Sequence, residues 1–271
     1  MAIRALAIDL DGTLLSGTEA VSPRNRQAVE AALAAGLQIV IATAGWYQRA
    51  ERVAKLFGLS GPIIACSGAE VRRLSDGADL LDLRMPAAFG TRLYEIIDAQ
   101  RCIAWVAQDD AVLMKIEGEL GAAALMPELL RVPSIAAAAR VPPRIILVQG
   151  SAVNRAIVDK LAPEWSDRVR FVSSISGHGK SILTLTATGA DKGVALAVAC
   201  RDLGCAPADV VAIGDAENDI EMFRVAGGSF AMGQADEAVK AAARAVTGSN
   251  EEDGVAQAIE LVLAQGERVF G

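Results

Sequence analysis

The first 66 residues alternate between apolar runs and amphipathic segments, and this order constrains the fold more than any other feature of the chain. The apolar runs are typical of buried strands, at 3–9, 38–42 and 62–66. The two segments between them are typical of helices, at 22–35 and 47–57. A glycine follows each helix, as expected at a helix C-terminus. A β-α-β-α-β order predicts an α/β fold with a doubly wound parallel sheet.

A second domain is predicted inside the first. Beyond residue 67 the pattern changes to short alternating segments, with a helix at 87–100 and a strand pair at 102–116, which is typical of an α+β domain. The earlier pattern resumes near Ile182. We therefore expect a Rossmann-like core made of residues 1–83 and 182–271, and an inserted α+β domain at 84–181.

The overall composition limits the partners of the chain. Apolar residues make up 52% of the 271, and the net charge is −7 at pH 7. The sequence has no block of basic residues, so we expect no nucleic-acid partner. It has no uninterrupted apolar stretch of about 18 residues, so we expect no membrane span. The chain opens on a strand pattern that carries Asp9, and not on a signal-peptide pattern, which favours a cytoplasmic location.

Sulfur and imidazole ligands are too sparse to predict a zinc site. The cysteines form no C-x-x-C pair and lie in or beside apolar stretches, which indicates buried, reduced thiols: Cys66, Cys102, Cys200 and Cys205. The single histidine, His178, lies in a glycine-rich turn, and no G-x-S-x-G nucleophile elbow accompanies it. We expect His178 to be a loop residue, with a role in holding substrate as the alternative.

Two aspartates end the first predicted strand. In A-L-A-I-D-L-D-G-T-L-L, Asp9 and Asp11 stand two residues apart, so both side chains point to the same side of the strand. Gly12 then permits a tight turn. Two carboxylates held close together repel each other unless one is protonated or a cation neutralises them. The pair indicates a divalent metal, an acid–base function or both, although a D-G turn alone needs neither.

Two further groups can hold an anion. Thr43 ends the second strand in A-T-A-G, where its hydroxyl and the backbone N–H groups of the turn that begins at Ala44 can donate to an anion. Lys192 follows Asp191, a predicted helix N-cap, and a cation at that end of a helix opposes the helix dipole. Each also has a purely structural explanation: Thr43 as a helix cap and Lys192 as a surface charge.

A second acidic group follows the predicted strand at 210–213. In V-V-A-I-G-D-A-E-N-D, Asp215 and Asp219 stand near the start of a helix, and Asn218 adds a further oxygen. Hard oxygen ligands of this kind suit Mg²⁺, which takes one or two carboxylates together with waters and substrate phosphate. Ligands of open α/β sheets bind at the carboxyl ends of the strands, near the topological switch point. These four elements are therefore expected to meet there.

In this order, the four elements resemble the motifs of the haloacid dehalogenase (HAD) superfamily of phosphatases. More narrowly, they resemble the Cof-like branch of sugar-phosphate phosphatases. The matching segments are D-L-D-G-T-L-L, the Thr43 strand end, D-K-G-V-A-L and G-D-A-E-N-D-I-E-M-F, and the run that begins A-M-G-Q-A-D-E-A-V also fits the branch. The resemblance covers the predicted core. It implies a Mg²⁺-dependent phosphatase whose insert closes over the core as a cap.

The resemblance also implies roles for single residues. Asp9 is the implied nucleophile, which forms an aspartyl-phosphate, and Asp11 is the implied acid and base. The groups implied to bind the phosphoryl oxygens are Thr43, Ala44, Lys192 and Asn218. The groups implied to bind Mg²⁺, directly or through water, are Asp9, the backbone carbonyl of Asp11, Asp215 and Asp219.

Two positions depart from the family pattern, and both bear on the substrate. Many relatives continue the threonine strand end as T-G-R, whereas this chain has T-A-G-W at 43–46; Arg49 is a candidate replacement for the absent arginine. Many relatives carry S-N-G-A where this chain has C-S-G-A at 66–69. Polar residues of the insert are candidates for reading the leaving group, with solvated surface charge as the default interpretation of each: Lys115, Arg144, His178 and Lys180.

Several functions remain to be weighed. The leading prediction is a phosphatase acting on a small phosphorylated metabolite, a sugar or polyol phosphate. A phosphomutase or phosphotransferase would pass the same aspartyl-phosphate to a second hydroxyl, and the sequence does not separate the two. Dehalogenation has little need for the acid at Asp11, and a non-catalytic sensor would have lost a nucleophile or metal ligand that this chain retains. Substrate identity and oligomeric state cannot be read from the sequence.

Overall fold

The computed structural model describes residues 3–18, 20–117, 128–175 and 179–270, and the chain divides into two units. The first consists of Met1–Leu81 and Asp191–Gly271, and the second is Asp82–Ala190. The α/β prediction is confirmed. The predicted second boundary, at 181/182, lies too early, because strand β11 (Ser181–Ala187) pairs with two strands of the second unit.

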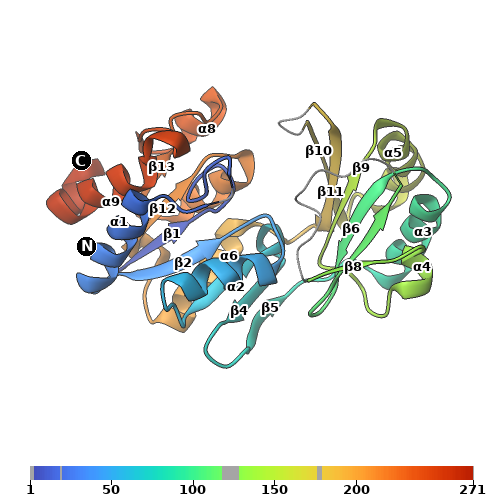
Figure 1. The fold of residues 1–271 in the computed structure, drawn as a ribbon, viewed down its shortest axis with the longest axis horizontal. Helices are drawn as coiled ribbons and strands as arrows, with labels where there is room; N and C mark the ends of the chain where they lie inside the picture. The colour runs from blue at the N-terminus through green and yellow to red at the C-terminus, as the bar shows by residue number, and fades with distance from the viewer. Residues whose placement is uncertain (1–2, 19, 118–127, 176–178, 271) are drawn as a thin grey trace. The chain divides into compact units, whose positions relative to one another are not determined.

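A largely parallel sheet forms the centre of the first unit (Figure 1), with the strand order β14-β13-β12-β1-β2-β3-β4-β5. Its strands are β1 (Ala5–Ile8), β2 (Gln38–Ala42), β3 (Pro62–Ala65), β4 (Glu70–Arg73), β5 (Asp79–Asp82), β12 (Val210–Gly214), β13 (Gly228–Ala231) and β14 (Ala245–Val246). The pairs from β14 to β3 are parallel, and β4 runs antiparallel to β3. This agrees with the strand series expected from the sequence.

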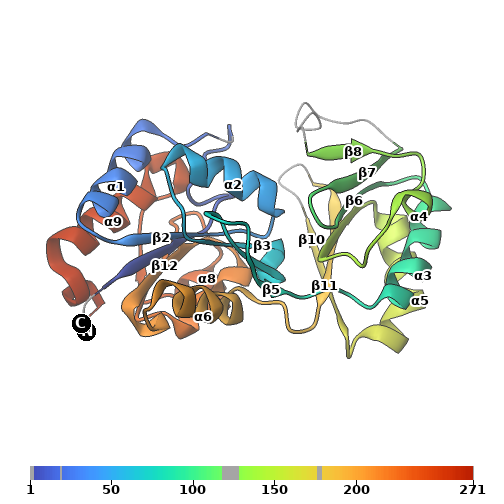
Figure 2. The ribbon, with the colours of Figure 1, turned by 90° about the horizontal axis from the view of Figure 1, so that it is seen from below.

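Helices cover both faces of this sheet, as Figure 2 shows. The helices are α1 (Pro23–Ala34), α2 (Tyr47–Leu56), α6 (Lys192–Leu203), α7 (Ile220–Val225), α8 (Glu237–Ala242) and α9 (Gly254–Gln265). Helices α6, α7 and α8 pack on the face that carries Ala5 and Ala7, while α1, α2 and α9 lie on the other face. Both strand faces are buried, which accounts for strands that are apolar throughout and not alternating.

The order of the strands creates a switch point beside β1. From β1 the chain proceeds outward through β2 and β3, and it later returns to the other side of β1 as β12. Ile8 is in register with both Ile41 and Ile213, and the Asp9 N–H donates to the Ile213 carbonyl at 3.0 Å. The parallel strands therefore end at one level, and the residues that follow them share one edge of the sheet.

A short turn after β3 holds two parts of that edge in place. This turn, η1 (Cys66–Gly68), has three consecutive residues at positive φ: 53° at Cys66, 55° at Ser67 and 90° at Gly68. The N–H groups of Cys66 and Ser67 donate to the Gly45 and Thr43 carbonyls, at 2.7 and 3.2 Å. Gly68 packs so closely on the start of α6 that a Cβ there would lie 2.2 Å from the Asp191 carbonyl oxygen.

The second unit is an α+β domain, as predicted. Its sheet has the order β10-β11-β9-β6-β7-β8 and is antiparallel except between β7 and β8. The strands besides β11 are β6 (Ile103–Ala107), β7 (Val112–Ile116), β8 (Leu129–Arg131), β9 (Ile145–Gln149) and β10 (Val169–Ile175). Helices α3 (Ala87–Asp98) and α5 (Ser151–Trp165) bury one face of the sheet, and the short helix α4 (Ile135–Ala138) packs beside them. Strand β8 was not expected from the sequence.

Lys115 is a structural residue of this unit, so its default interpretation as a solvated charge is wrong. Its side chain is buried, and the ammonium donates to the carbonyls of Ile97, Asp98 and Gln100 at 2.8, 3.2 and 2.9 Å. Ile97 and Asp98 are the last two residues of α3 and Gln100 follows the helix, so the cation lies where it complements the helix dipole and satisfies carbonyls at the helix end.

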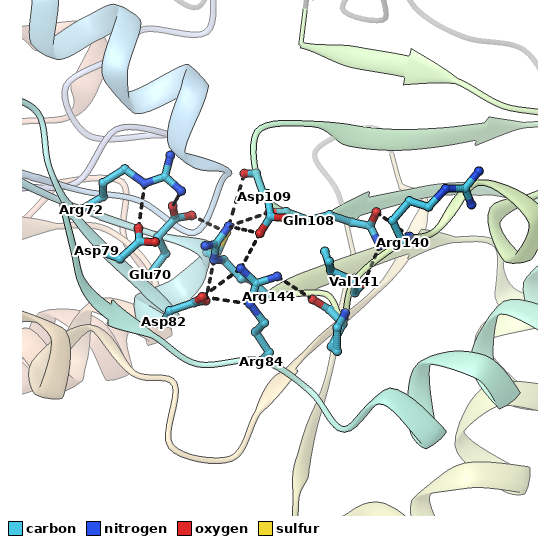
Figure 3. A network of polar contacts seen from close by, with 12 residues as sticks. Glu70, Arg72, Asp79, Asp82, Arg84, Gln108, Asp109, Arg140, Val141 and Arg144 are labelled. Carbon is cyan, nitrogen blue, oxygen red and sulfur yellow. Dashed lines mark hydrogen bonds and ion pairs between the residues drawn. The ribbon is translucent and has the colours of Figure 1, made fainter. Parts of the chain in front are cut away.

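Arg144 is likewise buried and held within the second unit, where Figure 3 shows its contacts. Its guanidinium contacts the Asp82 carboxylate at 2.8 Å and donates to the Gln108 carbonyl at 2.7 Å. Arg84 adds contacts to Asp82 and Asp109, at 2.8 and 2.5 Å. The two arginines thus join the beginning of the unit to the β6–β7 turn. The default interpretation of Arg144 as a surface charge is wrong as well.

Some predictions lie at or beyond the limits of the described structure. His178 falls outside the described residues, whereas Lys180 is described and exposed. All four cysteines are free, and Cys66, Cys102 and Cys200 are buried as expected, whereas Cys205 is partly exposed and not buried as predicted. Among the described residues, none of the helices combines the length and apolarity that crossing a membrane requires.

Replacing Gly68 by alanine is expected to destabilise the protein more than replacing Gly36. The two glycines have similar φ values, 90° and 87°, but a Cβ at Gly36 meets nothing within 4 Å. Both substitutions carry the penalty of left-handed backbone, about 1–2 kcal/mol. Gly68→Ala adds an overlap with backbone, which we expect to cost about 1–3 kcal/mol more. Denaturant unfolding of both variants measures the difference. Equal losses in the free energy of unfolding would show that the close packing of Gly68 on Asp191 does not affect stability.

Candidate active site

The structure brings three carboxylates from two strand ends into one cluster. Asp9 follows β1, while Asp215 and Asp219 follow β12, and an oxygen from each lies within 4.8 Å of the others. Asp9 and Asp219 are buried, and Asp215 is partly exposed. The residues that the sequence analysis assigned to this edge from opposite ends of the chain therefore meet.

One ammonium group lies inside the cluster. The Lys192 Nζ atom is 2.6 Å from Asp9 Oδ1 and 2.7 Å from Asp219 Oδ1, and the side chain is fully buried. Lys192 begins α6, whose N-cap is Asp191, as predicted from the sequence. The two carboxylates explain why a lysine is tolerated at a helix N-terminus, where the helix dipole opposes it. The interpretation of Lys192 as a surface charge is wrong.

Burial and charge shift the proton affinities of this group. Burial alone would lower the pKa of Lys192, but the carboxylates of Asp219 and Asp9 outweigh it and raise that pKa above its usual value. Burial raises the pKa of Asp9 well above 3.8; the charge of Lys192 opposes this shift, and those of Asp219 and Asp215 add to it. Burial, and then the charge of Asp219, raise the pKa of Asp215 to about 6. Because three carboxylates share one ammonium, their negative charge is only partly compensated.

Asp219 connects the lysine to the backbone after β12. One carboxylate oxygen accepts from Lys192, and the other accepts from the N–H groups of Asp215 and Ala216, both at 3.0 Å. Asp219 therefore satisfies the backbone N–H groups at the start of this segment. Its neighbour Asn218 lies in η4 (Glu217–Asp219), and the Asn218 Oδ1 atom is buried without a hydrogen-bond partner among the described residues.

The backbone after β1 approaches Asp215 closely. Gly12 has a φ of 78°, and a Cβ at this position would lie 2.3 Å from Asp215 Oδ2, so only glycine fits. The Thr13 hydroxyl donates to Asp215 Oδ1 at 3.0 Å, and the Gln234 amide donates to the Gly12 carbonyl at 2.5 Å. Neither Thr13 nor Gln234 was singled out from the sequence. Gln234 follows β13, so the strand-end rule that located the other residues could have found it.

Thr43 lies at the same edge, one strand further along. The residue is buried, its N–H donates to the Ile64 carbonyl at 2.9 Å, and its hydroxyl oxygen accepts from the Gly45 N–H at 3.0 Å. A hydroxyl that accepts from the backbone can still donate its own proton. The arrangement leaves that proton available to an anion, with the backbone of Ala44 forming the same turn.

Asp11 is not part of the three-carboxylate cluster, and it pairs with an arginine. Arg49, in the first turn of α2, contacts both carboxylate oxygens of Asp11: Nη2 lies 2.5 Å from Oδ1 and Nη1 lies 3.2 Å from Oδ2. The Asp11 side chain is 48% exposed, in contrast to buried Asp9. The two aspartates of the D-x-D pair thus have different surroundings, as two groups with different chemical roles require.

A second arginine supports the beginning of α2. Arg72 contacts Glu70 and Asp79 at 3.0 and 2.9 Å, and Figure 3 shows its guanidinium facing both carboxylates. Its guanidinium also stacks over the ring of Tyr47, 4.8 Å from the centroid. The hairpin formed by β4 and β5 is thereby tied to the helix that carries Arg49.

Comparison with known proteins agrees with this geometry. Residues 6–259 match the family model of haloacid dehalogenase-like hydrolases. The chain is 30% identical to a 5-amino-6-(5-phospho-D-ribitylamino)uracil phosphatase of Bacillus subtilis, over 97% of this chain and 99% of that protein. It is 29% identical to the pyridoxal phosphate phosphatase of Escherichia coli, over 96% and 98%.

Solved structures share the fold. A haloacid dehalogenase-like hydrolase from Bacteroides thetaiotaomicron superposes with a TM-score of 0.81 at 25% identity, covering 96% of this chain and 99% of that one. The family match spans both segments of the first unit and the inserted second unit. The chain therefore belongs to the haloacid dehalogenase-like hydrolases, in their Cof-like branch, and it is a phosphatase acting on phosphoric monoesters.

Proposed function

We propose that this phosphatase is Mg²⁺-dependent and hydrolyses a small phosphorylated metabolite, a sugar or polyol phosphate, through an aspartyl-phosphate on Asp9. The observation that carries the proposal is the contact of Asp9 with Lys192 inside the cluster of three carboxylates. A buried carboxylate beside an ammonium, at the switch point of an α/β sheet, is suited to attack a phosphorus atom whose oxygens the ammonium neutralises.

The residues divide the work of phosphoryl transfer. Asp9 attacks phosphorus while Lys192, the Thr43 hydroxyl and the turn at Ala44 hold the phosphoryl oxygens, with Asn218 assisting. Asn218 would assist by donating from its amide Nδ2, because its Oδ1, which is buried without a hydrogen-bond partner among the described residues, can only accept. Asp11 gives a proton to the leaving oxygen, and then takes one from the water that attacks the aspartyl-phosphate.

The donor set fits a hard divalent cation. Asp9 and Asp215 offer carboxylate oxygens, Asp219 lies beside them, and three carboxylates against one lysine leave an uncompensated negative charge in a buried place. Oxygen ligands with at least one partly exposed position suit Mg²⁺, which keeps several of its waters. When bound, the ion would neutralise the phosphoryl oxygens and orient the group for in-line attack.

The substrate class rests on the relatives and not on the described site. The Bacillus relative is named for a phosphorylated ribityl compound, which is a polyol phosphate, and the Escherichia relative for pyridoxal phosphate. A phosphate-release screen over sugar phosphates, polyol phosphates, pyridoxal phosphate, phosphoglycolate and nucleotides, with Mg²⁺ and with EDTA, tests both parts. Release to water distinguishes hydrolysis from transfer to a second hydroxyl. If nucleotides alone were turned over, the proposed substrate class would be wrong.

Replacing Asp9 by asparagine is expected to abolish turnover without unfolding the protein. The amide keeps the shape and an acceptor for Lys192, but it cannot attack phosphorus, so phosphate release should fall more than about 10³-fold. Asp159→Asn is a matched control, because Asp159 is exposed on α5. Phosphate release measures the loss of turnover in both variants, and thermal unfolding shows whether they remain folded. Wild-type activity in Asp9→Asn would show that another group is the nucleophile.

Replacing Asp215 by asparagine is expected to change stability in a pH-dependent way. With a pKa of about 6 in the folded protein against 3.8 ordinarily, Asp215 binds more proton when folded than when unfolded. Its contribution to stability therefore falls as the pH rises from 3.8 to about 6, and is constant above. In EDTA, the free energy of unfolding of Asp215→Asn should rise relative to that of the wild type as the pH increases across this window, by up to about 3 kcal/mol.

Added Mg²⁺ should reverse this order above pH 6, because a cation stabilises the ionised carboxylate and the amide binds it more weakly. Thermal unfolding from pH 4 to 8, with Mg²⁺ and with EDTA, measures both effects. If the difference in melting temperature between variant and wild type depended on neither pH nor Mg²⁺, Asp215 would be excluded from the metal site.

A further inference from the structure

We propose that Arg49 is a positioning residue for Asp11: it orients the acid–base carboxyl toward the leaving group, and it does not bind the substrate phosphate. This inference rests on the proposed function. It also gives Arg49 a different role from the one considered in the sequence analysis, where it was a candidate substitute for the arginine absent after Thr43.

The geometry is a two-point contact. Both terminal nitrogens of Arg49 face the Asp11 carboxylate, each beside a different oxygen, at 2.5 and 3.2 Å. In the part of the chain that the structure describes, no other side chain bonds this carboxylate. A fork of this kind fixes the plane of the carboxyl group as well as its position. A single ammonium would fix only the position.

Asp11 needs such support because its surroundings provide little. It lies in the turn that follows β1, next to Gly12, and its side chain is half exposed. Asp9, by comparison, is buried against Lys192. A half-exposed aspartate in a turn can adopt several rotamers, and an acid–base group must be held within hydrogen-bond reach of the oxygen it serves.

Stability alone does not account for the placement of Arg49. Arginine in the first turn of a helix is opposed by the helix dipole, and ion pairs with one half-exposed member contribute little to folding. Lys55 on the same helix, near its C-terminus, forms an ordinary surface pair with Glu51. The Arg49 side chain is only 17% exposed, against 62% for Lys55, so Arg49 does not occupy an ordinary surface position on this helix.

Leaving groups of different basicity separate positioning from phosphate binding. When the P–O bond breaks, its electron pair goes to the leaving oxygen; phenolate then needs a proton, which Asp11 supplies, whereas p-nitrophenolate leaves without one. Phenyl phosphate and p-nitrophenyl phosphate have the same phosphoryl group. A residue that acts through Asp11 therefore affects phenyl phosphate more, and a residue that binds phosphate affects both esters alike.

The experiment measures kcat/KM for the two esters in Arg49→Met, Arg49→Lys, Asp11→Asn and Arg49→Met/Asp11→Asn, each with its melting temperature. We expect Arg49→Met to lower kcat/KM for phenyl phosphate at least about tenfold more than for p-nitrophenyl phosphate, as Asp11→Asn does. Arg49→Lys, which keeps the charge without the fork, should recover only part of the loss. In the Asp11→Asn background, Arg49→Met should add nothing. Lys55→Gln is the matched control on the same helix and should leave both values unchanged.

Other outcomes overturn the inference in distinguishable ways. Equal losses on both esters, together with a further loss in the Asp11→Asn background, would make Arg49 a phosphate ligand. A lowered melting temperature with no selectivity between the esters would make it a structural residue. If Asp11→Asn discriminates between the esters and Arg49→Met does not, the positioning role fails while the proposed function stands. If the wild type releases phosphate neither from these esters nor from any phosphate ester of the screen described above, the proposed function fails and the inference with it.

Discussion

The ammonium of Lys192, held between Asp9 and Asp219 in a buried place, is the interaction on which the rest of the site depends. Buried ion pairs are poor stabilisers, because desolvating the charges offsets much of their attraction. A third carboxylate, Asp215, makes the arrangement less favourable still. A fold that needed only stability would place apolar side chains there. The cluster therefore indicates chemistry: a cation that the carboxylates can share and an anionic group that the lysine can hold.

The fold produces this cluster by register and not by local sequence. Asp9 and Lys192 are 183 positions apart, yet both lie at the edge where the parallel strands end. The strained turn η1 bonds to the carbonyls of Thr43 and Gly45, and its Gly68 packs against the residue that precedes Lys192. One three-residue segment thus links the turn at Thr43 to the lysine, which are the two places proposed to hold the phosphoryl oxygens.

Features set by local patterns could be predicted, and features set by distant contacts could not. The strands of the first unit, the N-cap at Asp191 and the acidic residues at strand ends follow from periodicity and capping. The burial of Lys115 and Arg144 could not be predicted. Lys115 lies on β7 and caps α3, and Arg144 pairs with Asp82, but in the sequence each looks the same as a charged surface residue. The predicted position of the second domain boundary was wrong because β11 pairs with β9 of the inserted unit. The sequence of one strand does not show which strand it pairs with. The contact of Arg49 with Asp11 has no motif at all.

Chemical trapping of the covalent intermediate tests the central claim most directly. The claim is that Asp9 itself accepts the phosphoryl group. Enzyme quenched during turnover with Mg²⁺ and p-nitrophenyl phosphate, then reduced with borohydride, should carry homoserine in place of aspartate at position 9, because borohydride reduces an acyl phosphate but not a free carboxylate. Peptide mass spectrometry locates the change. Conversion at Asp9 that depends on substrate is the predicted result, and conversion at another aspartate, or none while phosphate is released, would contradict the account.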